Sequence, residues 1–173
     1  MDNFSGAAMH LTITRWLREL WHSHPDLFHG KRVLDVGSSA VSGSAAPLFS
    51  DCQYVGLDAR PGPNVDVVCL AHQYQPEQPF DVVVCCSTLE HDPFWKQSLK
   101  HMPELLIPGG ALILAFPGPD WPVHEVECAP MPGYYRNLEA DEVLEVIEGK
   151  FEQVEVRRGD RETFVLATGR KGD

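Results

Sequence analysis

Basic residues are scarce in this chain. Its 173 residues include 14 Lys and Arg against 25 Asp and Glu, which gives a formal net charge of −11. The basic residues are scattered along the sequence rather than gathered in one stripe. Because a surface of this charge repels a polyanion, we do not expect nucleic acid as a substrate or partner.

The sequence also lacks a long apolar run. No stretch approaches the roughly 18 apolar residues that a membrane-spanning helix needs, and the N-terminus has no secretory signal pattern. There is no internal repeat and no linker rich in glycine or serine, so residues 1–173 are expected to form a single cytoplasmic domain. The oligomeric state is left open by the sequence.

Metal-binding patterns are missing as well. None of the five cysteines forms a pair at the two-residue spacing of a zinc site, and the histidines show no grouping with cysteines or acids. The cysteines are therefore expected to be buried, reduced thiols, and no metal site is expected.

Helical and strand patterns are nevertheless abundant. Within residues 1–29, Ile13, Trp16 and Leu20 share one face of an amphipathic helix, which packs against a sheet or serves a membrane surface or partner. Short apolar runs follow that are typical of strands buried on both faces: 32–37, 54–58, 65–69, 81–86 and 111–116.

A crossover helix is predicted between the last two runs, over residues 93–107. Asp92 is expected to cap it and Pro93 to be its first residue. Pro103 lacks the amide hydrogen that a continuous helix uses, which predicts a kink or break just before it. A Pro-Gly-Gly turn is predicted at 108–110.

The C-terminal part predicts a helix over 138–148, capped by Asn137, and then an antiparallel edge hairpin made by the alternating segments 153–158 and 163–169. Strands linked by helical segments indicate an α/β fold with a doubly wound, mostly parallel sheet and helices on both faces. Ligands of such sheets bind beyond the carboxyl ends of the strands.

The loop after the first strand is the first candidate site. Its sequence, VLDVGSSAVSGS, has Gly37 at the end of the strand, where glycine lets the backbone approach a ligand. Such a loop can hold a phosphate, an amino acid or nothing. Because positions 37, 39 and 42 read Gly, Ser and Ser, the three-glycine fingerprint for a dinucleotide is absent and pyrophosphate binding is disfavoured.

Two acids accompany this loop. Asp58 ends the second strand about 20 residues after Gly37, where a carboxylate can accept hydrogen bonds from both hydroxyls of a ribose. Asp35 lies in a buried strand and needs a cationic or amide partner, which the amino group of a ligand would provide. A phosphate-free ligand with an adenosine and an amino acid fits better than NAD.

Four segments carry a resemblance to a known family: VLDVGSS, YVGLDARPGPNVDVVC, FDVVVCCSTLEH and LLIPGGALILAFP. Within residues 30–116 they resemble the class I S-adenosylmethionine-dependent methyltransferases in order and approximate spacing. The resemblance implies a Rossmann-like methyltransferase fold and an enzyme that moves a methyl group from S-adenosylmethionine to a small or medium-sized acceptor. It implies cofactor contacts at Asp35, Gly37, Ser38, Ser39, Asp58, Ala59, Ala71, His72, Cys86 and Ser87.

Two positions depart from the family pattern. Ser39 stands where a second glycine is usual, and Leu70 stands where many members carry an acid that binds the adenine amine. A cofactor-binding module without turnover therefore remains an alternative. A nicotinamide-dependent oxidoreductase is a further alternative, disfavoured by the glycine pattern.

Candidate catalytic residues follow the fourth strand. His91 is the candidate base and Glu90 its neighbour, with a purely structural role at the helix entrance as the alternative. The loop 117–136, which contains five prolines, is expected to cover the acceptor site. Its candidate substrate residues are Trp121, His124, Tyr134, Tyr135 and Arg136. Alternatively, these aromatic residues anchor the loop to the core and Arg136 pairs with a surface acid.

Overall fold

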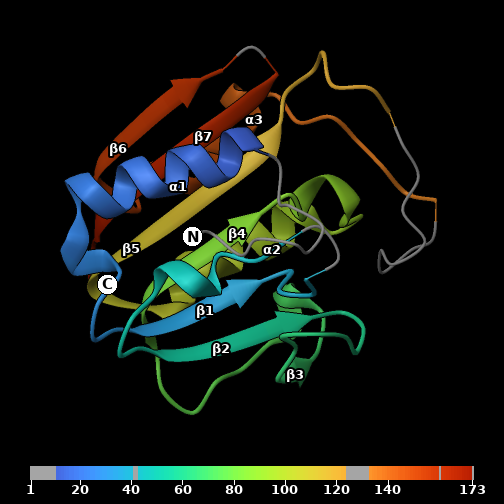
Figure 1. The fold of residues 1–173 in the computed structure, drawn as a ribbon. Helices are drawn as coiled ribbons and strands as arrows, with labels where there is room; N and C mark the ends of the chain where they lie inside the picture. Colours follow the sequence, from blue (N-terminus) through green and yellow to red (C-terminus); the bar gives the residue numbers. More distant parts are fainter. Residues whose placement is uncertain (1–10, 41–42, 124–132, 160, 173) are drawn as a thin grey trace, which may run out of the picture.

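The computed structural model describes residues 11–40, 43–123, 133–159 and 161–172. Its centre is a seven-stranded sheet in the order β3-β2-β1-β4-β5-β7-β6 (Figure 1). The first five strands are parallel, and β7 lies antiparallel between β5 and β6. The strands are β1 (Arg32–Val36), β2 (Gln53–Asp58), β3 (Val67–Val68), β4 (Phe80–Cys86), β5 (Leu106–Pro117), β6 (Phe151–Arg158) and β7 (Glu162–Arg170). The predicted fold class and edge hairpin are confirmed.

Helices cover both faces of this sheet. On one face, α1 (Leu11–Ser23) buries Trp16 and Leu17 against a cluster that includes Val82 and Val84 of β4. On the other face, α2 (Trp95–His101) and α3 (Ala140–Ile147) pack on a second cluster, which includes Val83. Because side chains alternate along a strand, the unbroken apolar run of β4 supplies both cores. The prediction that the N-terminal helix packs on the sheet is confirmed.

The predicted break in the crossover helix is also confirmed. The α-helix ends at His101 and continues as a 3₁₀ turn, Met102–Leu105. The start of the helix was predicted two residues too early, because α2 begins at Trp95. Asp92 still binds the first turn: its carboxylate accepts hydrogen bonds from the Phe94 amide at 2.7 Å and the Ser98 hydroxyl at 2.5 Å.

Two predictions near the C-terminal half are wrong. Asn137 does not cap α3, which begins at Ala140 after Glu139. The Pro-Gly-Gly segment does not form a separate turn, because β5 runs from Leu106 through it. Leu106 pairs with Phe80 and Ala111 with Val82, so the extra residues form a bulge inside the strand, where Gly109 has a φ of 82°. The predicted strand 65–69 is reduced to the two residues of β3.

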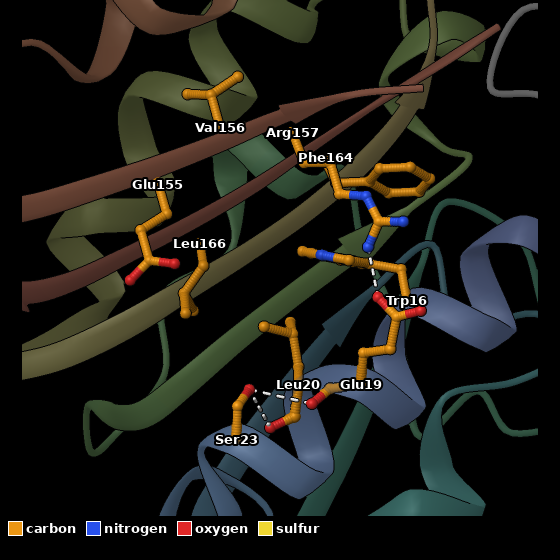
Figure 2. Close-up of a pocket in the computed structure, with 9 residues that line it drawn as sticks. All are labelled: Trp16, Glu19, Leu20, Ser23, Glu155, Val156, Arg157, Phe164 and Leu166. Carbon is orange, nitrogen blue, oxygen red and sulfur yellow. Dashed lines mark hydrogen bonds and ion pairs between the residues drawn. The ribbon is translucent and has the colours of Figure 1, made fainter. Parts of the chain in front are cut away.

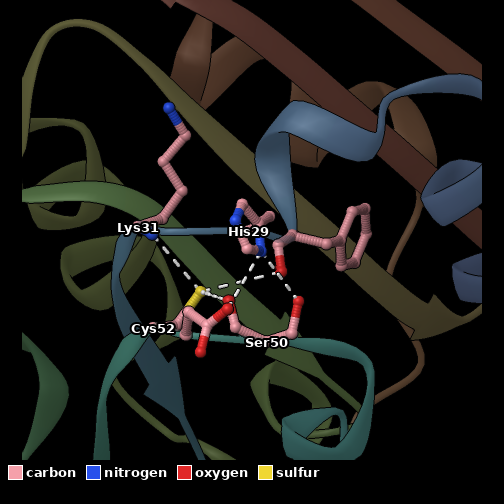
Figure 3. Close-up of polar contacts among 6 residues, drawn as sticks. His29, Lys31, Ser50 and Cys52 are labelled. Carbon is pink, nitrogen blue, oxygen red and sulfur yellow. Dashed lines mark hydrogen bonds and ion pairs between the residues drawn. The ribbon is translucent and has the colours of Figure 1, made fainter.

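The four cysteines that the structure describes are free, and Cys128 lies outside the described residues. Cys85 is buried, as expected, while Cys52, Cys69 and Cys86 are only partly buried. Figure 3 shows the Cys52 thiol at the amino end of β2, where it accepts a hydrogen bond from the Lys31 amide at 3.3 Å and donates to the carbonyl of Ser50 at 3.2 Å. Its backbone contacts give Cys52 a structural role.

None of the helices in the described part of the chain is both long and apolar enough to cross a lipid bilayer.

Candidate functional site

The carboxyl ends of β1 and β4 are packed tightly against each other. Gly37 follows β1 with a φ of 80°, and a Cβ atom added there would lie 2.0 Å from the Thr88 hydroxyl oxygen. The single hydrogen of the Thr88 hydroxyl can be donated to the carbonyl of Val36 at 3.3 Å or of Cys86 at 3.1 Å. Glycine is therefore required at this position both by the backbone conformation and by the neighbouring side chain.

Asp58, at the end of β2, lies against the loop after β1. One carboxylate oxygen accepts a hydrogen bond from the Ser39 amide at 3.2 Å, and the other accepts from the Arg60 amide at 3.1 Å. Since each carboxylate oxygen can accept two hydrogen bonds, the group retains capacity for two hydroxyls. The Ser38 side chain beside it is buried, and its hydroxyl oxygen has no hydrogen-bond partner among the described residues.

Asp35 is buried on the face of the sheet that α1 covers. Its partner is neither a cation nor an amide but a phenol, because the Tyr54 hydroxyl donates a hydrogen bond to it at 2.7 Å. Burial raises the pKa of Asp35 to about 6; the Tyr54 hydrogen bond opposes this rise, and the charge of Asp58 adds to it. Asp35 is therefore ionised at neutral pH but becomes protonated in mild acid.

Neither Tyr54 nor Thr88 was predicted from the sequence as part of the site. β1 and β2 pair in a register that places Asp35 opposite Gly56. Tyr54 is two residues before Gly56 in β2, so its side chain lies on the same face of the sheet as Asp35 and reaches it. Gly56 is closely packed by other groups, because an added Cβ atom would lie 1.8 Å from the Asn64 carbonyl oxygen. The only signal in the sequence is the spacing of Tyr54 and Gly56, and this has no meaning until the register is known.

Candidate adenine-side residues follow β2 and β3. Ala59 is partly buried directly after β2. Ala71 and His72 belong to a 3₁₀ turn, Ala71–Gln73, and the His72 ring lies 4.8 Å from the Phe94 ring. The turn follows β3, which pairs with the carboxyl end of β2, so these residues stand at the same edge of the sheet as Asp58.

The residues after β4 combine an exposed turn with a buried acid. Cys86 ends the strand, and Ser87 is exposed with a φ of 51°. Glu90 is buried, and one of its carboxylate oxygens lies 4.0 Å from Nε2 of His91. Its other oxygen has no hydrogen-bond partner within the described residues. Burial raises the pKa of Glu90 to about 8, so the protonated form dominates at neutral pH.

The end of the predicted substrate loop lies over this acid. The Arg136 amide donates a hydrogen bond to the Glu90 carbonyl at 2.8 Å, and the Tyr135 ring contacts the His91 ring at a centroid distance of 5.2 Å. Burial and the charge of Glu90 raise the pKa of Tyr135. The Arg136 guanidinium binds both carboxylate oxygens of Glu142 at 2.8 Å, which matches the alternative that Arg136 pairs with a surface acid.

The start of the loop is attached to its end by Asn137. The Asn137 side-chain amide donates hydrogen bonds to the carbonyls of Pro119 at 2.7 Å and Trp121 at 2.8 Å. This explains why Asn137 does not cap α3. Trp121 and Tyr134 are both partly buried, and His124 lies outside the described residues.

Within the residues that the structure describes, no group of three or more His, Cys, Asp or Glu side chains could hold a metal ion.

Comparison with known proteins agrees with this architecture. The family described as "Methyltransferase domain" matches residues 7–152. The ubiquinone biosynthesis O-methyltransferase of Idiomarina loihiensis is 31% identical over an alignment of 109 residues, which covers 54% of this chain and 45% of that protein. The chain thus matches a little under half the length of this curated relative.

Solved structures show the same fold. The 1,6-didemethyltoxoflavin-N1-methyltransferase of Burkholderia thailandensis, solved with S-adenosylhomocysteine, is 21% identical with a TM-score of 0.66, covering 92% of this chain and 78% of that one. The PH0226 protein of Pyrococcus horikoshii is 17% identical with a TM-score of 0.66, covering 98% and 96%. The chain belongs to the methyltransferase-domain family, and its resemblance to the class I S-adenosylmethionine-dependent methyltransferases is confirmed.

Proposed function

We propose that this protein is an enzyme that transfers a methyl group from S-adenosylmethionine to a small or medium-sized acceptor. The observation that carries the proposal is the group formed by Asp58, Gly37 and Asp35 at one edge of the sheet. It combines the Asp58 carboxylate, which can accept further hydrogen bonds, a sharp backbone turn at Gly37 that packs against Thr88, and the buried Asp35, which is ionised at neutral pH.

These residues fit the cofactor. Asp58 would accept hydrogen bonds from the ribose hydroxyls, and Asp35 would face the ammonium group. The buried Ser38 hydroxyl, which lacks a partner in the described residues, would bind a polar group of the amino-acid portion. Ala59, Ala71 and His72 would border the adenine, while Ser39, Cys86 and Ser87 would border the methionine portion and the sulfur.

The cofactor, when bound, supplies a methyl group already activated by a positively charged sulfur. The protein's part is to hold the acceptor in line with that methyl group, to exclude water and to take up a proton. His91 is proposed to take up the proton, and its position beside Glu90 after β4 supports this role. Trp121, His124, Tyr134, Tyr135 and Arg136 are proposed to border the acceptor.

Isothermal titration with S-adenosylmethionine, S-adenosylhomocysteine and NAD tests the binding half of the proposal. We expect micromolar affinity for the first two ligands and none for NAD. Binding of NAD alone would support the oxidoreductase instead. Transfer of a labelled methyl group to a panel of amines, phenols and thiols then separates an enzyme from a binding module, for which no acceptor would be labelled.

Replacing His91 with alanine should lower turnover at least about tenfold while the affinity for S-adenosylhomocysteine stays within about twofold. Steady-state kinetics and titration calorimetry measure the two effects. As a matched control, Glu90→Gln keeps the shape of the buried acid and should remove any inflection near pH 8 from the pH–rate profile. Equal losses of turnover and affinity in His91→Ala would indicate structural damage instead.

Replacing Tyr54 with phenylalanine should move the acid limit of cofactor binding to a higher pH. The hydroxyl lowers the pKa of Asp35, so its loss raises that pKa further and protonates the acid sooner. At pH 6.5 we expect the affinity for S-adenosylhomocysteine to fall about three- to tenfold. Calorimetry between pH 5 and 8 measures this. The acids and thiols near Asp35, namely Asp58, Cys85 and Cys86, remain in place.

The pH dependence of protein stability also reports the titration of Asp35. The pKa of Asp35 in the folded protein, about 6, lies above its ordinary value of 3.8, so the folded state binds more protons between these values. The contribution of Asp35 to stability is therefore greatest below about pH 4 and decreases as the pH rises through 6. An identical pH dependence of ligand binding in wild type and Tyr54→Phe would contradict the proposed role of Tyr54.

A further inference from the structure

The outer strand β6 is unusually open. It is the last strand in the order of the sheet, and no described strand pairs with its outer edge. Every residue of β6 after Phe151 is exposed, including Val154 and Val156 at 42% and 38%. An eight-residue edge with apolar side chains in the middle of it can accept a further strand.

The direction of its backbone groups follows from the hairpin. Gly159 donates a hydrogen bond to the Glu162 carbonyl at 2.8 Å, so the backbone of residue 159 faces β7. The register is regular from Gln153 to Arg158, and facing and non-facing residues alternate along an antiparallel pair. The odd-numbered residues Glu155 and Arg157 therefore bond to β7. Val154, Val156 and Arg158 direct their N–H and C=O groups outward.

The side chains alternate between the two faces of the sheet. Glu155 and Arg157 line a groove of about 230 Å³ between β6 and α1 (Figure 2), and Arg157 forms an ion pair with Glu19 of α1. Arg158 lies on the opposite face, where it forms an ion pair with Asp141 of α3 at 2.6 Å. Glu155 forms no ion pair with any described residue.

We propose that β6 pairs antiparallel with β6 of a second copy of this chain, about a two-fold axis that passes through Val156. In this register Val156 faces Val156 of the partner subunit. The outward-facing pairs, Val156 with itself and Val154 with Arg158, can each exchange two backbone hydrogen bonds. The two seven-stranded sheets then form one continuous sheet.

Charge supports this register and disfavours the one with the axis at Arg157. With the axis at Val156, Glu155 lies opposite Arg157 of the partner subunit, and this favourable pair occurs twice. With the axis at Arg157, Arg157 faces Arg157 of the partner subunit, and Glu155 loses its opposite charge. With the axis at Glu155, Glu155 faces Glu155 of the partner subunit, although Glu152 then lies opposite Arg158 of the partner subunit; the Glu155→Arg variant distinguishes this register, because it would not weaken that dimer. Like charges directly opposite each other are destabilising, and opposite charges stabilise a cross-strand pair by about 0.2–1 kcal/mol.

The charged side chains on β6 are thus compatible with pairing. Charges on an edge strand commonly prevent association when they repel, but here both signs occur at positions that match under two-fold symmetry. The net charge of −11 on each copy opposes association at low salt, and physiological salt screens this repulsion beyond about 8 Å. We therefore expect the dimer at physiological ionic strength and at micromolar or higher concentration.

Sedimentation velocity on the full chain, from about 5 to 300 μM in physiological salt, tests the proposal. Wild type should approach twice the chain mass of 19.3 kDa. Glu155→Arg should weaken dimerisation about tenfold, since two symmetric pairs are reversed. Glu155→Arg combined with Arg157→Glu should restore it to within about threefold. Glu77→Arg, an exposed site far from β6 in the sequence, changes the net charge equally and should leave the dimer intact.

A second variant tests the strand pairing itself. Val156→Pro removes an outward N–H group, which proline tolerates on an edge strand, so it should abolish the dimer with little change in melting temperature. A wild type that stays monomeric at the highest concentration overturns the proposal. So does a dimer that neither Glu155→Arg nor Val156→Pro weakens. A double variant that fails to restore dimerisation overturns the register.

Discussion

Replacing Gly37 with alanine should lower the free energy of unfolding by about 3 kcal/mol. Two effects add. A residue with a Cβ atom is strained at the φ of 80° that Gly37 adopts, and the added atom would overlap Thr88, whose hydroxyl oxygen would lie 2.0 Å away. Chemical denaturation measures the loss. The same variant should bind S-adenosylhomocysteine at least about tenfold more weakly, because the loop after β1 must shift.

The glycine at 109 provides a matched control. Its φ of 82° is nearly the same as that of Gly37, but no atom lies within 4 Å of an added Cβ. Gly109→Ala should therefore show only the backbone strain, about 1 kcal/mol. Thr88→Gly should recover part of the loss in Gly37→Ala by removing the overlapping atoms. Equal losses in the Gly37 and Gly109 variants would show that Thr88 does not constrain Gly37.

Replacing Asp58 with alanine should weaken the binding of S-adenosylhomocysteine at least about 100-fold. The proposed cofactor site assigns two hydrogen bonds from ribose hydroxyls to this carboxylate, and hydrogen bonds to a charged group contribute about 1.5–3 kcal/mol each. The variant also loses the contacts with the Ser39 and Arg60 amides, which orient the loop after β1. Titration calorimetry measures the affinity.

Replacing Asp66 is a control that separates the loss of ligand contacts from the loss of a backbone hydrogen bond. Its carboxylate also accepts a hydrogen bond from a backbone amide, that of Gly56, at 2.8 Å, but no role in the cofactor site is proposed for it. Asp66→Ala should reduce stability by about 1–2 kcal/mol and change the affinity for S-adenosylhomocysteine only a few-fold. An Asp58→Ala variant that binds within threefold of wild type would remove the main support for the proposed cofactor site.

Much of the fold could be predicted because its signals are local. The apolar run of β4, which is buried on both faces, identifies a central strand, and the alternation in β6 identifies an edge strand; the predicted alternation in β7 is not observed, because its first six residues are all buried between β5 and β6. Pro103 marks the end of the α-helical turns because it lacks an amide hydrogen. The errors occurred where a local signal competed with a distant partner. Asn137 is a favourable cap, yet its side chain bonds to carbonyls of the loop at Pro119 and Trp121.

The candidate site likewise combines residues that the sequence predicts and contacts that only the structure reveals. Gly37 and Asp58 could be identified from sequence because the end of each parallel strand lies at one edge of the sheet. The phenol that holds Asp35 could not, because the contact depends on the register between β1 and β2. Glu90, whose pKa is raised by burial, likewise has a distant partner, because its carbonyl accepts a hydrogen bond from the amide of Arg136, 46 positions further along the chain.

By itself, the sequence determined the α/β architecture, the family and the edge of the sheet at which the cofactor site is proposed, because periodicity and short motifs depend on neighbours in the chain. Only the tertiary structure decided that Thr88 fills the space at Gly37, that Tyr54 holds Asp35 and that β6 presents an unpaired edge. These features arise from packing between segments far apart in the sequence, whose register and separation no local pattern specifies.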